Sequence, residues 1–214
     1  MTRSSRRDWT STLTDIRRFN AACRGGGPEA LQAFYDLTSR LFCLTVGHKN
    51  AGVHLDRGIR HGHGTVVGGH GEDDQLIRLT NNHYLRLVIA LYLPDGEDRH
   101  LRTSLSVHQY QASQADSEWV FRYDYKRDPQ GNRHPAAHLH VNARLKTKGV
   151  STKLPFDRVH FYTGRPTLEG TIRLLIEQFE VSSNSEPEVW RPALHESETS
   201  FLDVAHRPLP GVLS

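Results

Sequence analysis

The stretch "YLRLVIALYL", residues 84–93, decides the fold class because its most apolar side chains fall on every second position. A period of two is the pattern of a β-strand that buries one face. The turn sequence "PDGED" follows at 94–98, and "HLRTSLSVHQY" at 100–110 again carries evenly spaced apolar residues. Residues 84–110 therefore predict a β-hairpin.

Two more strands and a helix follow the hairpin. The segments "EWVFRYDYK" (118–126) and "AHLHVNARL" (137–145) alternate in the same way. By contrast, "TLEGTIRLLIEQF" (167–179) spaces its apolar residues as an amphipathic helix does, with Thr167 as its N-cap. We therefore expect an α+β fold in which an antiparallel sheet of at least four strands is covered by a C-terminal helix.

The flanking regions divide the chain into four parts. Residues 1–46 predict an N-terminal helical hairpin, because three glycines and Pro28 separate two amphipathic stretches. Residues 47–75 are rich in glycine and histidine, which favours a long exposed loop or a short edge hairpin. Residues 76–181 form the expected sheet-plus-helix core. Residues 182–214 are polar and interrupted by prolines, which predicts a tail or a partner-binding segment.

The composition limits the class of protein. The chain has 214 residues, of which 36% are hydrophobic and 24% are charged, and it contains no unbroken apolar run long enough to cross a membrane. Its first residues, "MTRSSRRDWTST", lack the apolar core of a secretion signal. We therefore expect a cytoplasmic protein with no membrane partner. The formal net charge of +3, with 14 histidines in addition, is compatible with RNA as a partner.

The strongest chemical signal is a pair of histidines on the fourth predicted strand. His138 and His140 are two residues apart, so on a strand they project from the same face, about 6.5–7 Å from each other. If the preceding strand pairs with this one, Arg122 and Asp124 emerge beside them. Imidazoles transfer protons near neutral pH, a carboxylate can orient an imidazole, and a guanidinium binds phosphate.

These groups favour ribonuclease chemistry, because RNA supplies its own nucleophile in the 2′-hydroxyl. In that interpretation His138 and His140 act as general acid and base without a metal cofactor. Asp124 orients one of the two imidazoles, and Arg122 contacts the phosphate.

A second group of candidates precedes the C-terminal helix. The N-terminus of a helix presents free backbone N–H groups and the positive end of its dipole, which suits a phosphate. Arg165 and Thr167 stand at that point of the sequence, with His160 a few residues earlier. We expect these three residues to bind the substrate.

The histidines have two other interpretations. His138 and His140 on one strand face, together with His160, are a common set of ligands for zinc or manganese, and the protein would then be a metal-dependent hydrolase or nuclease. Alternatively, the same side chains are polar residues on the solvated face of a non-catalytic module that binds RNA or protein. The sequence leaves these alternatives open.

The ordered elements of the centre resemble those of a known family. An apolar strand with a "PDG" turn is followed by "FRYDY" (121–125), "HPAAHLH" (134–140) and "GRPTLEGTIRLLIEQF" (164–179). This succession, over residues 84–180, resembles the TumE-like toxin family of bacterial toxin–antitoxin systems. The resemblance implies a sheet-plus-helix fold of the RelE and barnase kind, and an endoribonuclease toxin that blocks translation and has an antitoxin as its protein partner. Position by position, it points to Arg122, Asp124, His138 and His140.

Overall fold

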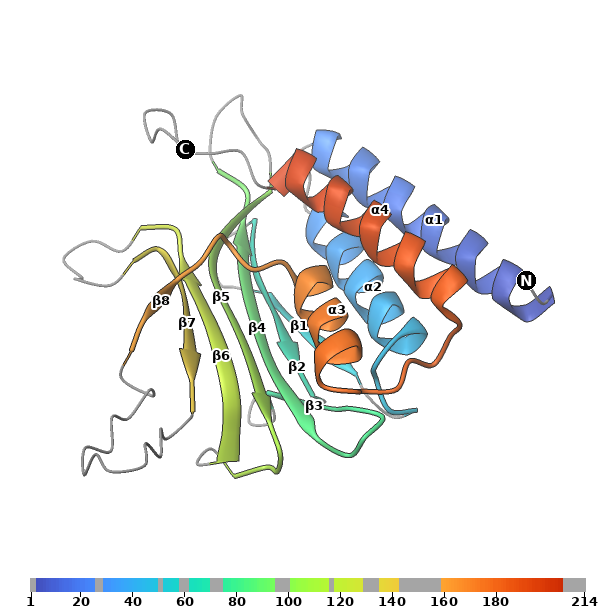
Figure 1. Cartoon of the computed structure of the whole chain (residues 1–214). Coiled ribbons are helices and arrows are strands. Elements are labelled where there is room, and N and C mark those ends of the chain that lie inside the picture. The colour runs from blue at the N-terminus through green and yellow to red at the C-terminus, as the bar shows by residue number, and fades with distance from the viewer. Residues whose placement is uncertain are drawn as a thin grey trace, which may run out of the picture.

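The protein has an α+β fold with its helices on one side of an antiparallel sheet (Figure 1). The computed structural model describes residues 3–25, 29–49, 52–57, 62–69, 75–94, 101–115, 118–128, 135–142 and 159–205. Within these ranges the sheet has eight strands and is accompanied by four helices. The fold class expected from the sequence is confirmed, as is the pair of helices at the N-terminal end.

The strands are β1 (Val53–Arg57), β2 (His63–Gly68), β3 (Leu76–Arg78), β4 (Tyr84–Tyr92), β5 (Arg102–Gln111), β6 (Trp119–Lys126), β7 (Ala137–Val141) and β8 (Phe161–Tyr162). The helices are α1 (Arg3–Gly25), α2 (Glu29–Leu44), α3 (Leu168–Gln178) and α4 (Pro187–Ala205). The strands follow the order β1-β2-β4-β5-β6-β7-β8 across the sheet, and β3 pairs with the first residues of β4. Of these described helices, none has the length and apolar character needed to cross a membrane.

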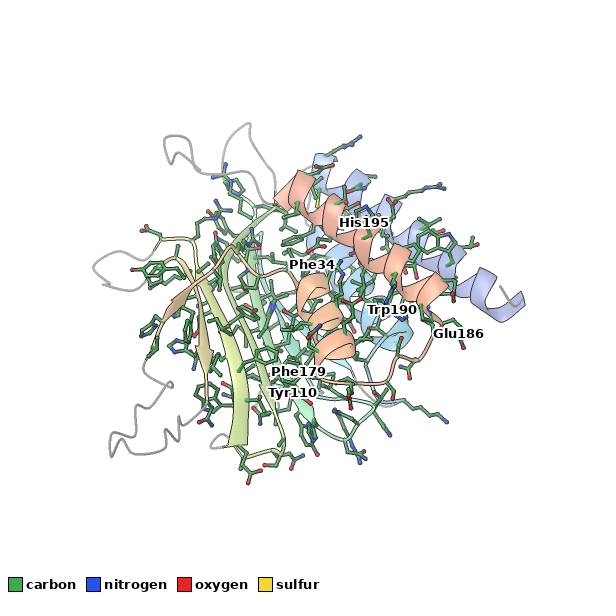
Figure 2. The ribbon with its side chains drawn as sticks, in the orientation of Figure 1. Phe34, Tyr110, Phe179, Glu186, Trp190 and His195 are labelled. Carbon is green, nitrogen blue, oxygen red and sulfur yellow. The ribbon has the colours of Figure 1, made fainter. Side chains whose placement is uncertain are left out.

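The central β4–β5 hairpin is present as the alternation predicts, and it supplies much of the core. Leu85, Leu87 and Leu91 of β4 are each at most 2% exposed on the side that faces the helices. Burial of one such side chain stabilises the fold by about 1.5–3 kcal/mol. On the same side, the rings of Tyr110 in β5 and Phe179 after α3 meet edge to face, with 5.2 Å between their centroids (Figure 2).

Of the two alternatives expected for region 47–75, the described residues show the edge hairpin and not the long loop, because β1 and β2 pair at one edge of the sheet. Two glycines of β2 allow neighbouring segments to pack closely against this strand. A Cβ atom on Gly68 would lie 2.8 Å from the carbonyl oxygen of Gln75, and one on Gly64 would lie 3.3 Å from Leu31 of α2. Glycine in this strand therefore marks the close approach of neighbouring elements.

The described part of the region 182–214 is not a tail, because it forms α4, which packs against α1 and α3. Trp190 and Leu194 of this helix are buried in the core. Pro192 lies inside the helix, where it has no N–H to donate to the preceding turn. That proline and a largely polar composition concealed an apolar stripe with helical spacing, so the sequence interpretation was wrong here.

Two leucines of α4 provide a test of this packing. Leu194 is fully buried, whereas Leu202 is 39% exposed. We expect Leu194→Ala to lower the free energy of unfolding by about 2–5 kcal/mol, and Leu202→Ala to lower it by about 1 kcal/mol or less. Urea denaturation of the two variants measures the difference. Equal losses would show that α4 does not rest on the core in solution.

A buried carboxyl group links α3 to α4. Glu169, in the first turn of α3, is 4% exposed and accepts a hydrogen bond from Ser197 Oγ at 2.6 Å. Burial raises the pKa of Glu169 from 4.5 to about 6, and the hydrogen bond from Ser197 opposes this change. Among the nearby charges, Glu198 raises this pKa and Arg173 lowers it, and Arg165 also interacts with the carboxyl. The carboxyl group of Glu169 therefore keeps its proton to a higher pH in the folded protein than in the unfolded chain.

This pKa shift predicts how stability depends on pH. A group with a higher pKa in the folded than in the unfolded state stabilises the fold at low pH, and this contribution is lost as the pH rises through the folded pKa. As the pH rises from 4.5 to 7, the unchanged protein should lose about 2 kcal/mol of unfolding free energy that Glu169→Gln does not lose, because glutamine does not titrate. Urea denaturation of both proteins across this range checks the result. A stability difference that does not vary with pH would contradict it.

Candidate functional site

The pairing of β6 with β7 places four candidate residues in two cross-strand pairs. Arg122 lies opposite His140, and Asp124 lies opposite His138. Phe121, one position before Arg122, is buried in the core, so the four side chains project from the face of the sheet that points away from the helices. We call this the outward face. The strand alternation predicts the same arrangement.

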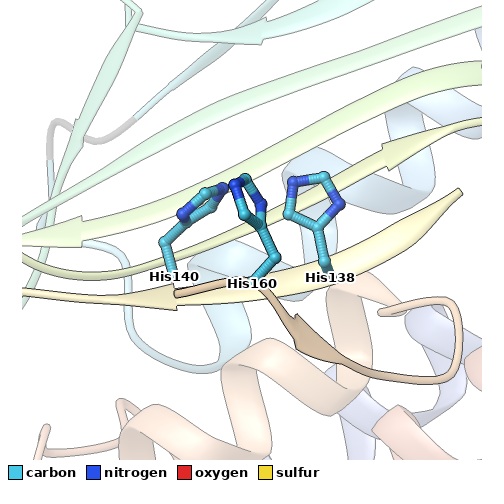
Figure 3. Close-up of side chains that lie close together, drawn as sticks. All are labelled: His138, His140 and His160. Atoms are coloured by element: carbon cyan, nitrogen blue, oxygen red, sulfur yellow. The ribbon is translucent and has the colours of Figure 1, made fainter. Parts of the chain in front are cut away.

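His160 joins this group from the position just before β8. Tyr162 of β8 lies opposite His138, so His160, two residues earlier, lies beside His140. The ring centroids of His140 and His160 are 4.3 Å apart, and each lies 4.8 Å from the centroid of His138 (Figure 3). Ring nitrogens of the three histidines all lie within 4.8 Å of one another. The three rings therefore form one cluster rather than separate surface side chains.

Asp124 lies against two of these rings. Its Oδ2 atom is 3.8 Å from Nε2 of His138 and 3.5 Å from Nε2 of His140. Two ligand atoms bound to one tetrahedral zinc ion at roughly 2.1 Å are about 3.4 Å apart. The spacing of Asp124 from the two imidazoles is thus similar to that between neighbouring groups at a metal ion, but among the described residues the grouped ligand atoms come from the three histidines alone.

A backbone carbonyl fixes the orientation of His138. Its Nδ1 atom is 3.0 Å from the carbonyl oxygen of Pro135, which can only accept, so the hydrogen bond requires a proton on Nδ1. In the neutral ring the lone pair is then on Nε2, which faces Asp124. Metal-binding histidines are commonly oriented by such a hydrogen bond. Sequence reasoning did not identify Pro135, although it lies only three residues before the histidine.

Arg122 forms an ion pair with the same carboxylate, that of Asp124. Its Nε atom is 2.9 Å from Oδ1 and 2.8 Å from Oδ2 of the carboxylate. The Arg122 side chain is 45% exposed, whereas the side chains of Asp124, His138 and His140 are only 12–16% exposed. A partly exposed ion pair of this kind adds little stability, so its main effect is to orient the carboxylate toward the imidazoles.

These side chains line a pocket of about 310 Å³ on the outward face. The histidines form one end of the pocket, over β7 and β8. The other end lies over β5 and the last residues of β6, where Leu105, Val107 and Lys126 line it. The sequence marks Leu105 and Val107 only as evenly spaced apolar residues of the hairpin, and Lys126 only as a polar residue of the next strand, so it does not predict that they line a pocket.

Arg165 and Thr167 lie on the helix-facing side of the sheet, which corrects their assignment to one substrate site with the histidines. Arg165 donates to Oγ1 of Thr103 at 2.5 Å, and its guanidinium carbon lies 4.7 Å from the ring centroid of Tyr125 and 5.0 Å from that of Phe201. Thr167 is the N-cap of α3. Both residues therefore hold the segment that leads from β8 into α3. Of the three expected substrate-binding residues, His160 alone reaches the pocket.

Another histidine of the sheet also faces the helices. His108 of β5 is 1% exposed, and its Nδ1 atom is 2.8 Å from Oγ1 of Thr171 in α3. Burial and, to a smaller extent, the charge of Arg165 together lower the pKa of His108 to about 3. This imidazole is therefore neutral at physiological pH, and it connects the sheet to α3 rather than joining the histidine cluster. His134 lies outside the described residues.

Comparisons with models of known protein families, with curated proteins and with solved structures found no match for this chain. The chemistry of the pocket is therefore the basis for inferring a function.

Cobalt binding tests whether the three histidines act as one metal site. Because the loss of an outer-shell partner alone weakens metal binding by about 10–100-fold, His160→Ala should weaken Co²⁺ binding by at least about 100-fold. His195→Ala, at an exposed position of α4, is the matched control and should leave the affinity unchanged (Figure 2). The visible absorption of bound Co²⁺ measures both. Equal affinities for the two variants would exclude His160 as a ligand.

Proposed function

We propose that the protein is a metal-dependent phosphodiesterase whose ion is held by His138, His140 and His160. The observation that carries this proposal is the convergence of three imidazoles, two from β7 and one from the residue before β8, beside the carboxylate of Asp124. Three histidines suit zinc and leave a coordination position for water. Imidazole ligands favour zinc over manganese, which prefers oxygen ligands.

The spacing of the rings supports metal binding over acid–base catalysis by histidines alone. In acid–base cleavage of RNA, the base contacts the 2′-hydroxyl and the acid contacts the leaving 5′-oxygen, each at about 3 Å and on opposite sides of the phosphorus. The two imidazoles must then stand on either side of that phosphate. The observed centroid distances of 4.3 and 4.8 Å put the rings nearly in contact, with no space for a phosphate between them.

A metal ion at this position would supply a water with a lowered pKa as the nucleophile. On this proposal Asp124, beside the imidazoles, would accept the proton of that water. The bond from phosphorus to the leaving oxygen would break as the water oxygen adds, and Asp124 would return the proton to the leaving group. Arg122 at the rim stabilises the negative charge that develops on the non-bridging oxygens.

RNA is the phosphodiester that we propose as the substrate. The resemblance of residues 84–180 to the TumE-like toxins supports RNA, and the net charge of +3 is compatible with it. On this proposal the protein is a toxin-like endoribonuclease that acts in the cytoplasm and has an antitoxin as its protein partner.

A metal-independent ribonuclease is the second candidate, and one observation favours it. The hydrogen bond from Nδ1 to Pro135 leaves the lone pair of His138 on Nε2, and an imidazole whose other nitrogen is held by an acceptor is a competent general base for the 2′-hydroxyl of RNA. His140 would then be the general acid, and Arg122 would bind the phosphate.

Chelation separates the two candidates. We expect the protein to cleave a single-stranded RNA oligonucleotide, to lose this activity in excess EDTA, and to regain it with zinc. Because metal-activated water does not use the 2′-hydroxyl, the products should lack a 2′,3′-cyclic phosphate. Gel electrophoresis measures the cleavage, and mass spectrometry of the products identifies their end groups. His140→Ala should be inactive throughout, and His54→Ala, on the edge strand β1, should retain the activity of the unchanged protein.

Each other outcome has a defined meaning. Cleavage that resists the chelator and leaves a 2′,3′-cyclic phosphate would overturn the metal proposal and support the second candidate. An absence of cleavage with and without zinc would overturn both, and would favour a module that binds RNA or protein without catalysis.

A further inference from the structure

The pocket continues away from the histidines onto an apolar shelf formed by Leu105 and Val107. Both side chains project from β5 on the outward face and are partly exposed. The strand register places Val107 opposite Asp124 and Leu105 opposite Lys126. The shelf is therefore directly beside the polar groups of the pocket, on the adjacent strand.

Around the shelf, β5 has the reverse of the usual pattern. Ser106 and His108, which alternate with the shelf residues, are 3% and 1% exposed and face the helices. Leu105 and Val107 face the pocket instead. A strand that simply covered the core would bury its apolar residues and expose its polar ones. This reversal indicates that the apolar side chains serve the pocket.

Distance and volume limit what the shelf can hold. Neighbouring strands lie about 4.8 Å apart, and β6 alone separates β5 from β7, so the shelf is about 10 Å from the histidine strand. A group attached to a phosphate at the histidines can cover this distance with one sugar and one ring. The pocket volume of about 310 Å³ is at the lower end of the range for small-ligand sites, which excludes a folded or double-stranded partner from the shelf.

We infer that the shelf binds the base of one unpaired nucleotide whose phosphate lies at the histidine end of the pocket. The position of the phosphate rests on the proposed function. Apolar side chains bind the flat face of a base without selecting its identity, because every base offers such a face. Lys126, exposed opposite Leu105, is placed to pair with the next phosphate of the strand.

Calorimetry with two simple ligands tests this inference. Uridine 5′-monophosphate and ribose 5-phosphate share the phosphate and the sugar and differ in the base. We expect the full-length protein to bind uridine monophosphate at least about tenfold more tightly. Val107→Thr, which keeps the shape of the side chain and removes apolar surface, should reduce this preference by about five- to tenfold. Val88→Thr is the matched control: Val88 lies opposite Val107 on the outward face but outside the pocket, and its substitution should leave the preference unchanged.

The outcomes distinguish this inference from the proposed function. Equal binding of the two ligands, or the same effect of Val107→Thr and Val88→Thr, would overturn the shelf as a base site. The titrations are run with and without zinc. If the base preference persists while zinc neither binds nor supports hydrolysis, the metal-dependent function is overturned and the base site stands.

Discussion

The candidate site depends on the register between β6 and β7. Because side chains alternate between the faces of a sheet, a slip of β7 by one residue against β6 would turn His138 and His140 toward the helices. Packing on the helix-facing side of the sheet prevents such a slip. Phe121 of β6 packs against Tyr110 and Phe179, with ring centroids 5.7 and 5.2 Å apart, which fixes the face that β6 turns toward the helices, and Leu139 of β7 packs against the same core. The aromatic core thus determines which polar groups meet on the outward face.

The two faces of β6 differ in what they contribute to stability. The helix-facing side removes aromatic surface from water, which stabilises the fold. The outward side places a carboxylate and imidazoles, each only 12–16% exposed, where they lose much of their hydration. The Arg122 ion pair offsets part of this cost for Asp124, but a solvated polar face would avoid it altogether. Clustering of this kind is typical of binding or catalytic sites rather than of structural ones.

Local patterns predicted the part of the fold in which local chemistry and tertiary packing agree. Alternation identified β4 to β7 and the shared face of Asp124 and His138, because a period of two is readable in a single strand. It did not identify α4, where Pro192 interrupts a polar helix. Nor did it show that His108 would turn inward, because the partner that stabilises this orientation, Thr171, is 63 residues away in sequence. A periodicity carries no information about such distant partners.

His160 is the member of the cluster with the least local support, and this determines how the site is assembled. It precedes β8, which has two residues and an exposed aromatic, Tyr162, at 81% exposure, so the pairing of β8 with β7 fixes its position only weakly. The stronger restraint is on the C-terminal side, where Arg165 is held between Tyr125 of β6 and Phe201 of α4. The terminal helix therefore helps to position a proposed metal ligand from the opposite face of the sheet. By linkage, an ion that binds all three histidines would in turn stabilise the attachment of β8 and of the segment that joins it to α3.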